Sequence, residues 1–588
     1  MQPLPGHQFS CHTSPHPSAR SNPGPCLPPD PLACQLDPSP AANSSPPLDP
    51  DRDPDLDSHL SSEPHPGSRP YGADSTPQAE GSPSPDQALL DWLASHGAEL
   101  QKCIFPVGFD MQGGQVRGVA AAQCIEAGDL VFQIPAGLLI TLRVVYASPL
   151  REIMLRHSDI GGNGTLALAL FLVHEAHAGA NSFFHPYINA LPTLADFGYI
   201  PHLWTGPEHD ELQDASSIEQ IRTEAARWRY KWTQLRTLFA ERYPHVAALQ
   251  TPAFSEDRFL WAVLNVQTRS FANGLESDFE QCLVPFADLL NHPPPGVTVD
   301  GPEWCPRQGS SGPCFQMRAT AQRRHGEQLY NSYGAYKSCQ ALICQYGFVS
   351  PSPRAIILMD LAILPSKPKL QAMEERGWNG GRCECDEYLP YCRLAVCTKE
   401  DIEAVASGGR SLANAVESPL SVANELQALA RMQNALEKLL EGCPTTLQED
   451  EQLLAQLVPE RAGGRMDGPK RARYCDPPKA GQPDGPTAGP QQRLHLALLY
   501  RMQWKRSLRH HLKFVAMALC ATRTIAGWCP AHHGEADSDA RSDLDPSDIV
   551  GYLESWPRDL LPISEADAAA AVCSALSAVR ALAQAGKG

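Results

Sequence analysis

Two blocks of strand-like sequence are separated by a long helical stretch, and this order strongly limits the folds open to the chain. Short apolar segments punctuated by Gly and Pro occupy residues 113–141 and 282–349, a pattern typical of strands and turns. Between them, at about 142–265, apolar residues recur at helical spacing, and they do so again after residue 400. The two β-rich blocks must therefore meet in space across a helical insertion, and a site at their junction would draw on both.

Two Pro-rich regions predict segments without regular structure. Residues 1–85 hold 21 of the 55 prolines, with much Ser and Asp and little aliphatic content. Such a composition buries too little apolar surface to offset the entropy of ordering, so we predict a disordered tail. The first 29 residues lack acidic groups, as in a transit peptide, but Arg20 is their only arginine, which favours a plain tail. The Gly/Pro-rich stretch 460–492 predicts an inserted loop.

Local signals mark the starts of two helices. Asp86 is expected to cap a short helix that Gly97 ends, at the point where order begins. In "PTTLQEDEQLL", Thr446 and Glu449 have the spacing of a capping box and apolar residues follow. Both segments are therefore predicted to be helical.

The charge and the cysteines restrict the partners and the compartment. A formal net charge of −18 argues against a general binder of nucleic acid or of anionic membranes. The chain contains no run of 18 or more apolar residues, so we expect no membrane span. The 19 cysteines are odd in number and scattered, which favours free thiols in a reducing compartment. We expect a cytoplasmic protein, a nuclear one or both, and leave a plastid open.

One cysteine cluster has two interpretations. Cys383, Cys385, Cys392 and Cys397 could supply four thiolates to zinc, but their spacing is not that of paired C-x2-C knuckles. The residues between them alternate polar and apolar, as in a β-hairpin. The sequence favours free thiols in a hairpin and predicts no metal site, with structural zinc as the alternative. Nucleophile-elbow, P-loop and H-E-x-x-H motifs are absent from the sequence.

The stretch "VPFADLLNHPPPG", residues 284–296, places polar side chains at the edge of an apolar run. Val284, Phe286 and their apolar neighbours should be buried, so Asp288, Asn291 and His292 would cost free energy without hydrogen-bond partners. Either these three close a turn, or they hold a polar ligand.

Three stretches together carry a family resemblance. They are "GGQVRGVAA" at 113–121, "VQTRSF" at 266–271 followed by "VPFADLLNH", and "EQLYNSYGAYKSCQALICQYGFVS" at 327–350. In this order they resemble SET-domain protein methyltransferases. More narrowly, they are similar to the subfamily that includes the Rubisco large-subunit lysine methyltransferase and SET domain-containing proteins 3 and 4. The D-x-x-N-H element and the downstream Y-G-x-x-K-S are specific in combination.

The resemblance implies S-adenosyl-L-methionine as the cofactor. It assigns cofactor contacts to Gln115, Val116, Arg117, Arg269, Asp288, Asn291, His292 and Tyr333. The first three would act mainly through their backbone, and Arg269 would pair with the cofactor's carboxylate. Asn291 and His292 would hold its amino and adenine ends, which answers the question raised by the polar edge.

The resemblance also implies a catalytic residue and a channel. Tyr333 matches the catalytic tyrosine, and Tyr346 and Phe348 would wall the channel for the target side chain. Methyl transfer from a sulfonium to an amine is an in-line displacement, so catalysis rests mainly on alignment. A narrow apolar channel also favours the neutral, nucleophilic amine.

The resulting prediction is an α+β protein with three parts. A disordered tail at 1–85 precedes a β-rich SET fold at 86–350, which carries the helical insertion. An all-α domain follows at 351–588 and would dock a protein substrate. The predicted activity is transfer of methyl to a protein lysine. A protein-histidine methyltransferase, an inactive SET-fold binding module and a zinc-stabilised adaptor are the alternatives.

Overall fold

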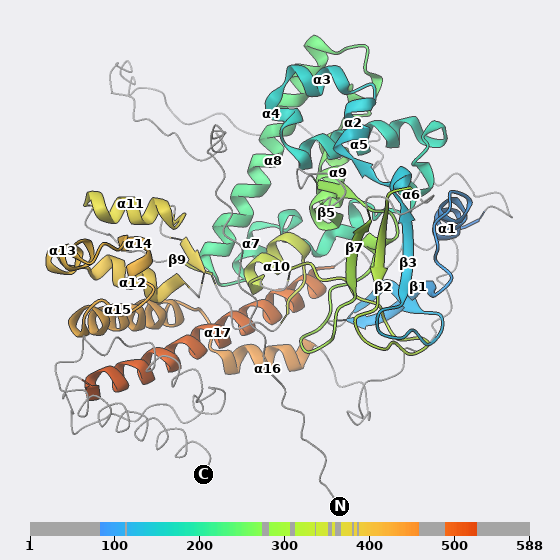
Figure 1. Cartoon of the computed structure of the whole chain (residues 1–588). Helices are drawn as coiled ribbons and strands as arrows, with labels where there is room; N and C mark the ends of the chain where they lie inside the picture. The colour runs from blue at the N-terminus through green and yellow to red at the C-terminus, as the bar shows by residue number, and fades with distance from the viewer. Residues whose placement is uncertain are drawn as a thin grey trace, which may run out of the picture. The chain divides into compact units, whose positions relative to one another are not determined.

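The structure is a computed structural model, and most of the chain between residues 83 and 525 can be described (Figure 1). The described residues are 83–111, 114–272, 281–305, 312–334, 337–350, 356–358, 366–378, 382–384, 387–457 and 489–525. The predicted tail therefore lies outside the described residues up to residue 82. The predicted inserted loop lies outside them up to residue 488, and its last residues belong to a helix that begins at Pro490.

The first helix, α1 (Pro85–Ser95), begins earlier than predicted. Ser84 is its N-cap and accepts a hydrogen bond from the backbone N–H of Gln87 at 3.2 Å. Proline at the first helical position suits this start because its φ is already helical. The prediction that Asp86 caps the helix is wrong, since Asp86 lies in the first turn and pairs with Arg117 at 2.6 Å. Gly97 follows the helix with a φ of +85°.

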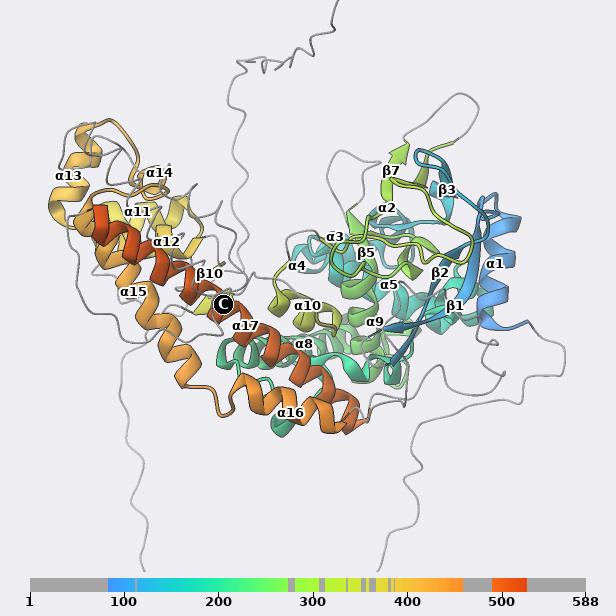
Figure 2. The ribbon, with the colours of Figure 1, turned by 90° about the horizontal axis from the view of Figure 1, so that it is seen from below.

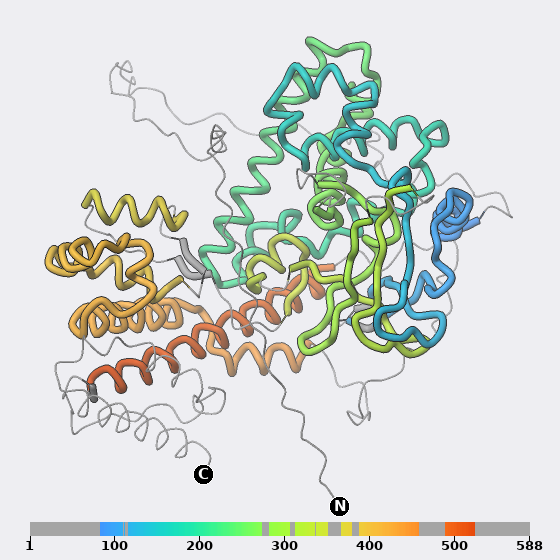
Figure 3. Tube along the Cα trace, in the orientation of Figure 1, coloured from blue at the N-terminus to red at the C-terminus, as the bar shows by residue number. Residues whose placement is uncertain are grey.

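Strands of the two sequence blocks pair with each other, as predicted. β3 pairs antiparallel with β8, and β8 with β7, while β6 lies between β4 and β5. β1 pairs with β2 as a separate ribbon. In the register, Ile134 lies opposite Phe315 and Ile140 opposite Leu283, so segments far apart in sequence run side by side (Figure 3). The strands are β1 (Cys103–Met111), β2 (Gly114–Ala121), β3 (Leu130–Pro135), β4 (Ile140–Thr141), β5 (Ser270–Ala272), β6 (Gln281–Leu283), β7 (Gly301–Cys305) and β8 (Cys314–Arg318).

Helices occupy the chain between β4 and β5. The α-helices are α2 (Leu142–Ala147), α3 (Arg151–Arg156), α4 (Ser158–Gly161), α5 (Gly164–Ala178), α6 (His185–Ala190), α7 (Gly206–Asp210), α8 (Ala215–Arg242) and α9 (Glu256–Arg269). α5 is buried along residues 166–173 and contacts α9. Their apolar residues join those of the strands in one hydrophobic core. α9 ends at Arg269, directly before β5, and so returns the chain to the sheet.

The remaining elements are mostly helical. They are α10 (Cys339–Tyr346), β9 (Ile356–Leu358), α11 (Lys367–Glu375), β10 (Arg382–Glu384), α12 (Tyr388–Val396), α13 (Lys399–Ser407), α14 (Leu412–Ala415), α15 (Val422–Glu441), α16 (Leu447–Leu457) and α17 (Pro490–Ile525). α17 runs alongside α15 and α16 (Figure 2). The predicted capping box is present, with the Thr446 N–H donating to Glu449 Oε2 at 2.7 Å and the Glu449 N–H donating to Thr446 Oγ1 at 3.2 Å. None of the helices in the described part of the chain is both long and apolar enough to span a bilayer.

Two strand predictions are wrong. Residues 339–346 form α10, capped by the Ser338 side chain, and residues 388–396 form α12 rather than part of a hairpin. Short apolar runs fit both periodicities, and here packing on neighbouring helices decides. Cys392 and Cys397 are buried, whereas Cys385 and the Cys383 side chain lie outside the described residues. The described residues contain no group of three or more metal-ligating side chains.

A buried ionic network joins α16 and α17 to the helical insertion. The Asp450 carboxylate accepts from Arg501 at 2.8 Å and from Lys505 at 2.6 Å, and all three side chains are almost fully buried. Arg501 also donates to Glu211 Oε2 at 2.7 Å, and Lys505 to Gln213 Oε1 at 2.8 Å. Both cations therefore depend on one carboxylate and on residues that precede α8.

Replacing Asp450 tests this junction. Asp450→Ala would leave buried Lys505 without the carboxylate it pairs with and Arg501 with Glu211 alone, so we expect the free energy of unfolding to fall by about 3–5 kcal/mol. Urea unfolding of the full chain measures it. Glu451→Ala is the matched control, because its pair with Arg506 is about half exposed and should change stability by about 0–1 kcal/mol. Equal effects of the two substitutions would contradict a structural role for the network.

Candidate functional site

The polar edge identified in the sequence follows a fully buried segment. Every residue from 284 to 290 is buried, including η6 (Ala287–Leu289). Phe286 has a φ of +75°, a conformation that costs a non-glycine residue about 1–3 kcal/mol. Its ring packs edge-on against Phe105 at 6.1 Å and Phe132 at 5.2 Å, which holds it there. Packing therefore determines the path of the backbone into Asp288.

Asp288 is bound by two residues of the helical insertion. Its side chain is 0% exposed, and Oδ2 accepts a hydrogen bond from the Tyr187 hydroxyl at 2.9 Å. Arg269 Nη1 donates to the Asp288 carbonyl at 2.9 Å and lies 3.5 Å from Oδ2. Burial raises the pKa of Asp288, and the Arg269 charge opposes that shift. Arg269 Nε and Asp288 Oδ1 are buried without a partner among the described residues.

Asn291 lies against β2 through a close backbone approach. Its Nδ2 donates to the Arg117 carbonyl at 3.2 Å, and an added Cβ on Gly118 would lie 2.6 Å from that nitrogen. Only glycine leaves room for Asn291 here. The Arg117 guanidinium is engaged elsewhere, with Asp86 and with the Ala190 carbonyl at 3.0 Å. Arg117 therefore presents its backbone carbonyl to Asn291, and its predicted backbone contact with the cofactor stays a prediction.

Within its described part, the structure gives no contact with Asn291 for the two other predicted residues of that turn, Gln115 and Val116. Val116 is exposed, at 37%, which leaves the strand open to a ligand on that side. Gln115 pairs with Asp110 in the β1–β2 ribbon, and its side chain lies outside the described residues.

One polar side chain at this site was missed in the sequence. Gln328 is 8% exposed, and its Nε2 has no partner among the described residues. That nitrogen would lie 3.1 Å from a Cβ on Gly118, so the Gln328 and Asn291 amides both approach the same point of β2. The sequence does place this amide beside an apolar residue shortly before Tyr333, and that was the available signal. Its long-range neighbour in β2 could not be predicted from the sequence.

The remaining predicted residues form an aromatic cluster of His292, Tyr333, Tyr346 and Phe348. Ring centroids are 5.4 Å apart for His292–Tyr333, 4.8 Å for Tyr333–Tyr346 and 5.6 Å for His292–Phe348. The Tyr333 N–H donates to His292 Nδ1 at 3.2 Å, so the neutral imidazole carries its proton on Nε2. The Tyr333 hydroxyl donates to the Leu290 carbonyl at 3.0 Å.

Burial shifts the pKa values of the titratable side chains in this cluster in the direction that favours their neutral forms. It lowers the pKa of His292, with the Lys337 charge adding to the effect. Burial raises the pKa of Tyr333 well above its usual value, although the Arg269 charge opposes this, and it raises that of Tyr346 to about 12. Tyr333 therefore stays protonated at neutral pH, as a hydrogen-bond donor rather than a base.

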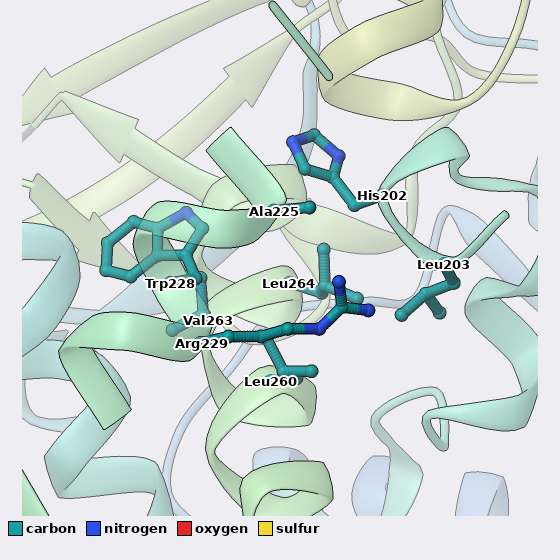
Figure 4. Close-up of a pocket in the computed structure, with 8 residues that line it drawn as sticks. All are labelled: His202, Leu203, Ala225, Trp228, Arg229, Leu260, Val263 and Leu264. Atoms are coloured by element: carbon teal, nitrogen blue, oxygen red, sulfur yellow. The ribbon is translucent and has the colours of Figure 1, made fainter. Parts of the chain in front are cut away.

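Two hollows lie away from this cluster. One, drawn in Figure 4, lies where the segment with His202 and Leu203 packs on the helices α8 and α9. Its volume of 10 Å³ has room for about one water molecule. The other, of 220 Å³, is lined by residues that include His174, His177 and His245. Neither is lined by a residue predicted for the site.

Comparisons with known proteins identify both parts of the chain. Residues 367–508 match the family model for Rubisco LSMT substrate-binding. The solved structure described as the SET domain of LSMT bound to lysine and AdoHcy matches with a TM-score of 0.56 and 20% identity. That match covers 74% of this chain and 92% of the other. The chain has a SET fold of the Rubisco LSMT type.

Curated relatives match at 24–28% identity. Mouse SET domain-containing protein 4 is 28% identical over 45% of this chain and 58% of its own length. The Rubisco large subunit N-methyltransferase of Nicotiana tabacum is 25% identical over 64% and 76%. Human actin-histidine N-methyltransferase is 24% identical over 62% of each chain. The chain thus spans about three fifths of the length of SET domain-containing protein 4.

The tight contact at Gly118 leads to a prediction. In Gly118→Ala the new methyl group must displace Asn291, so we expect the free energy of unfolding to fall by about 1–3 kcal/mol. Thermal or urea unfolding measures this. Gly137→Ala is the control, because a Cβ there meets no atom within 4 Å, and its effect should stay within about 0.5 kcal/mol. A fully stable Gly118→Ala protein would contradict the close approach of Asn291.

Proposed function

We propose that the protein is an S-adenosyl-L-methionine-dependent methyltransferase that transfers a methyl group to a lysine side chain of a protein substrate. The observation that carries this proposal is that Asn291 and His292 meet Tyr333, 41 positions further along the chain, at one half-buried aromatic site in a SET fold. A methyltransferase needs a polar cradle for the cofactor beside an apolar channel for the amine, and the polar and aromatic side chains of this site are of the kinds that would form them.

The polar groups around Asn291 suit the cofactor. Arg269 Nε, Asp288 Oδ1 and Gln328 Nε2 are buried without partners among the described residues, and such atoms are costly unless a ligand satisfies them. Val116 and Arg117 would contribute backbone groups, as would Gln115. Arg269 would face the cofactor's carboxylate with the donors it does not give to Asp288, and Asn291 and His292 would bind its amino and adenine ends.

The aromatic cluster suits the reaction itself. When bound, S-adenosylmethionine supplies an electrophilic methyl group on a sulfonium. Tyr333 would orient the amine lone pair, together with carbonyl oxygens such as that of Leu290, to which its hydroxyl donates. Tyr346 and Phe348 would enclose the lysine stem and exclude water, which favours the neutral amine. Because Tyr333 keeps its own proton, the amine must lose its proton before it is aligned.

Two alternatives follow from the comparisons and the site. Actin-histidine N-methyltransferases are similar to this chain at 24% identity, so a histidine acceptor is the second candidate. Lysine is preferred because the Arabidopsis aldolase-lysine relative matches at 26% and the matching LSMT SET-domain structure is bound to lysine. An inactive binding module is disfavoured because Asn291, His292 and Tyr333 are all in place.

The substrate is a protein, and we propose that the helical domain docks it. The match to the Rubisco LSMT substrate-binding family over residues 367–508 supports this arrangement. No direct contact with nucleic acid is proposed. We propose a cytoplasmic or nuclear location, or both, and the chloroplastic relatives keep a plastid as the further candidate.

Calorimetry of the full chain with S-adenosylmethionine is the first experiment. We expect saturable binding that Asn291→Ala weakens about 5- to 20-fold, the effect of losing one or two hydrogen bonds. Asn414→Ala, an exposed asparagine of α14, should bind like the parent. A well-folded chain that does not bind the cofactor would overturn the enzyme proposal in favour of the inactive module.

Tyr333→Phe tests the catalytic assignment. Loss of the hydroxyl should lower turnover about 100-fold through misalignment, while cofactor affinity changes less than about threefold. Transfer of label from S-adenosylmethionine to the proteins of a cell extract measures turnover. Tyr330→Phe is the matched control. Tyr330 forms a backbone β-bridge with Asn291, and loss of its hydroxyl leaves that bridge intact. A Tyr333→Phe enzyme as fast as the parent would show that the assigned role is wrong.

A further inference from the structure

Lys337 lies beside the aromatic cluster with its side chain fixed. Its ammonium is 5.5 Å from the centroid of the Tyr346 ring and donates to Gln345 Oε1 at 3.0 Å. The Gln345 amide in turn donates to the Gln267 carbonyl of α9 at 3.3 Å. An added Cβ on Gly334 would lie 3.0 Å from Lys337 Cε, so this glycine leaves room for the lysine stem. The lysine is held on two sides.

No described acidic side chain neutralises the positive charge of Lys337. Among the described residues it forms no ion pair, and its hydrogen-bond acceptor is an uncharged amide. The titratable groups that face the site are Tyr346 from α10, Tyr333 from the segment before it, and His292 from the segment after η6. Behind Tyr333 lie Tyr199 and the Arg269–Asp288 pair, in which the two charges offset each other. Within the described part of the chain, Lys337 is thus a positive charge beside the Tyr346 ring that has no acidic partner.

We propose that Lys337 acts as an electrostatic specificity residue, which disfavours a protonated substrate amine at the Tyr346 wall and favours the neutral, nucleophilic form. This inference rests on the proposed function. In the reaction, the amine lone pair forms the new N–C bond while the C–S bond breaks, and the sulfur leaves with the bonding pair as a neutral thioether. A protonated amine has no lone pair to donate. A fixed cation nearby shifts the amine toward its neutral form by ordinary charge repulsion.

The same field acts on His292, which provides a readout without catalysis. His292 already has a lowered pKa, caused first by burial and second by the Lys337 charge. Removing that charge should raise the His292 pKa, whatever the substrate is. Only a neutral His292 can accept the Tyr333 N–H at Nδ1, so the Lys337 charge also preserves that hydrogen bond at mildly acidic pH.

The test compares Lys337→Met, which keeps an apolar stem without the charge, with Lys337→Arg, which keeps the charge. We expect the acid limb of the pH profile of kcat, which reports groups in the enzyme–substrate complex, to move up by about 0.5–1.5 pH units in Lys337→Met and to stay in place in Lys337→Arg. NMR titration of the full chain should show the His292 pKa rising in Lys337→Met only. The His292 signal is assigned by its absence in His292→Gln.

The outcomes separate this inference from the proposed function. A parent chain that binds no cofactor and methylates no protein overturns the proposed function, and the role of Lys337 in catalysis falls with it. An active parent with an acid limb unmoved in Lys337→Met overturns the role of Lys337 alone. Equal loss of rate in both variants at every pH would mean that Lys337 only supports the fold. A lower KM in Lys337→Met with an unmoved limb would show that Lys337 competes for the Tyr346 ring, which also overturns the proposal.

Discussion

The site depends on one buried carboxylate, that of Asp288. Tyr187 of α6 donates to it, and Arg269 at the end of α9 contacts both its carboxylate and its carbonyl. A carboxylate this deeply buried is costly unless it is hydrogen-bonded and paired, so segment 284–292 can take its path only with the helical insertion folded around it. The insertion is therefore part of the site. It supplies the partners of Asp288, which precedes Asn291, and Asn291 contacts β2.

Much of this arrangement could be predicted because it follows from pattern and order. Two β-rich blocks on either side of a helical stretch had to pair, and β3 with β8 and β4 with β6 do so. A polar edge on a buried run had to find partners, and Asp288 and Asn291 find them. Burial and hydrogen-bonding requirements act on any chain, so the sequence shows where they arise even though it does not show which residues meet them.

The errors concern information that short segments do not carry. The apolar residues of α10 and α12 fit a strand as well as a helix, and contacts with α15 and α17 select the helix. The contact of Arg269 with Asp288, 19 positions along the chain, was not predicted. Gln328 was missed because its importance comes from Gly118, on a strand far away in sequence. Each of these depends on a long-range contact that residue type and spacing leave open.

The aromatic cluster lies where two hydrophobic cores meet, and this connects the site to the helical domain. Leu289 and Leu290, beside Asn291, belong to the core of the SET fold, whereas α10, which ends at Tyr346, contributes Ile343 to the core of the C-terminal helices. Tyr199 packs against both cores, and Gly347, with a φ of +70°, leaves room for its ring. The 4.8 Å spacing of the Tyr333 and Tyr346 rings is thus set by how the two cores fit together. Because α10 contacts α17, the docking role proposed for the C-terminal helices would be connected to the Tyr346 ring through a single contact between helices.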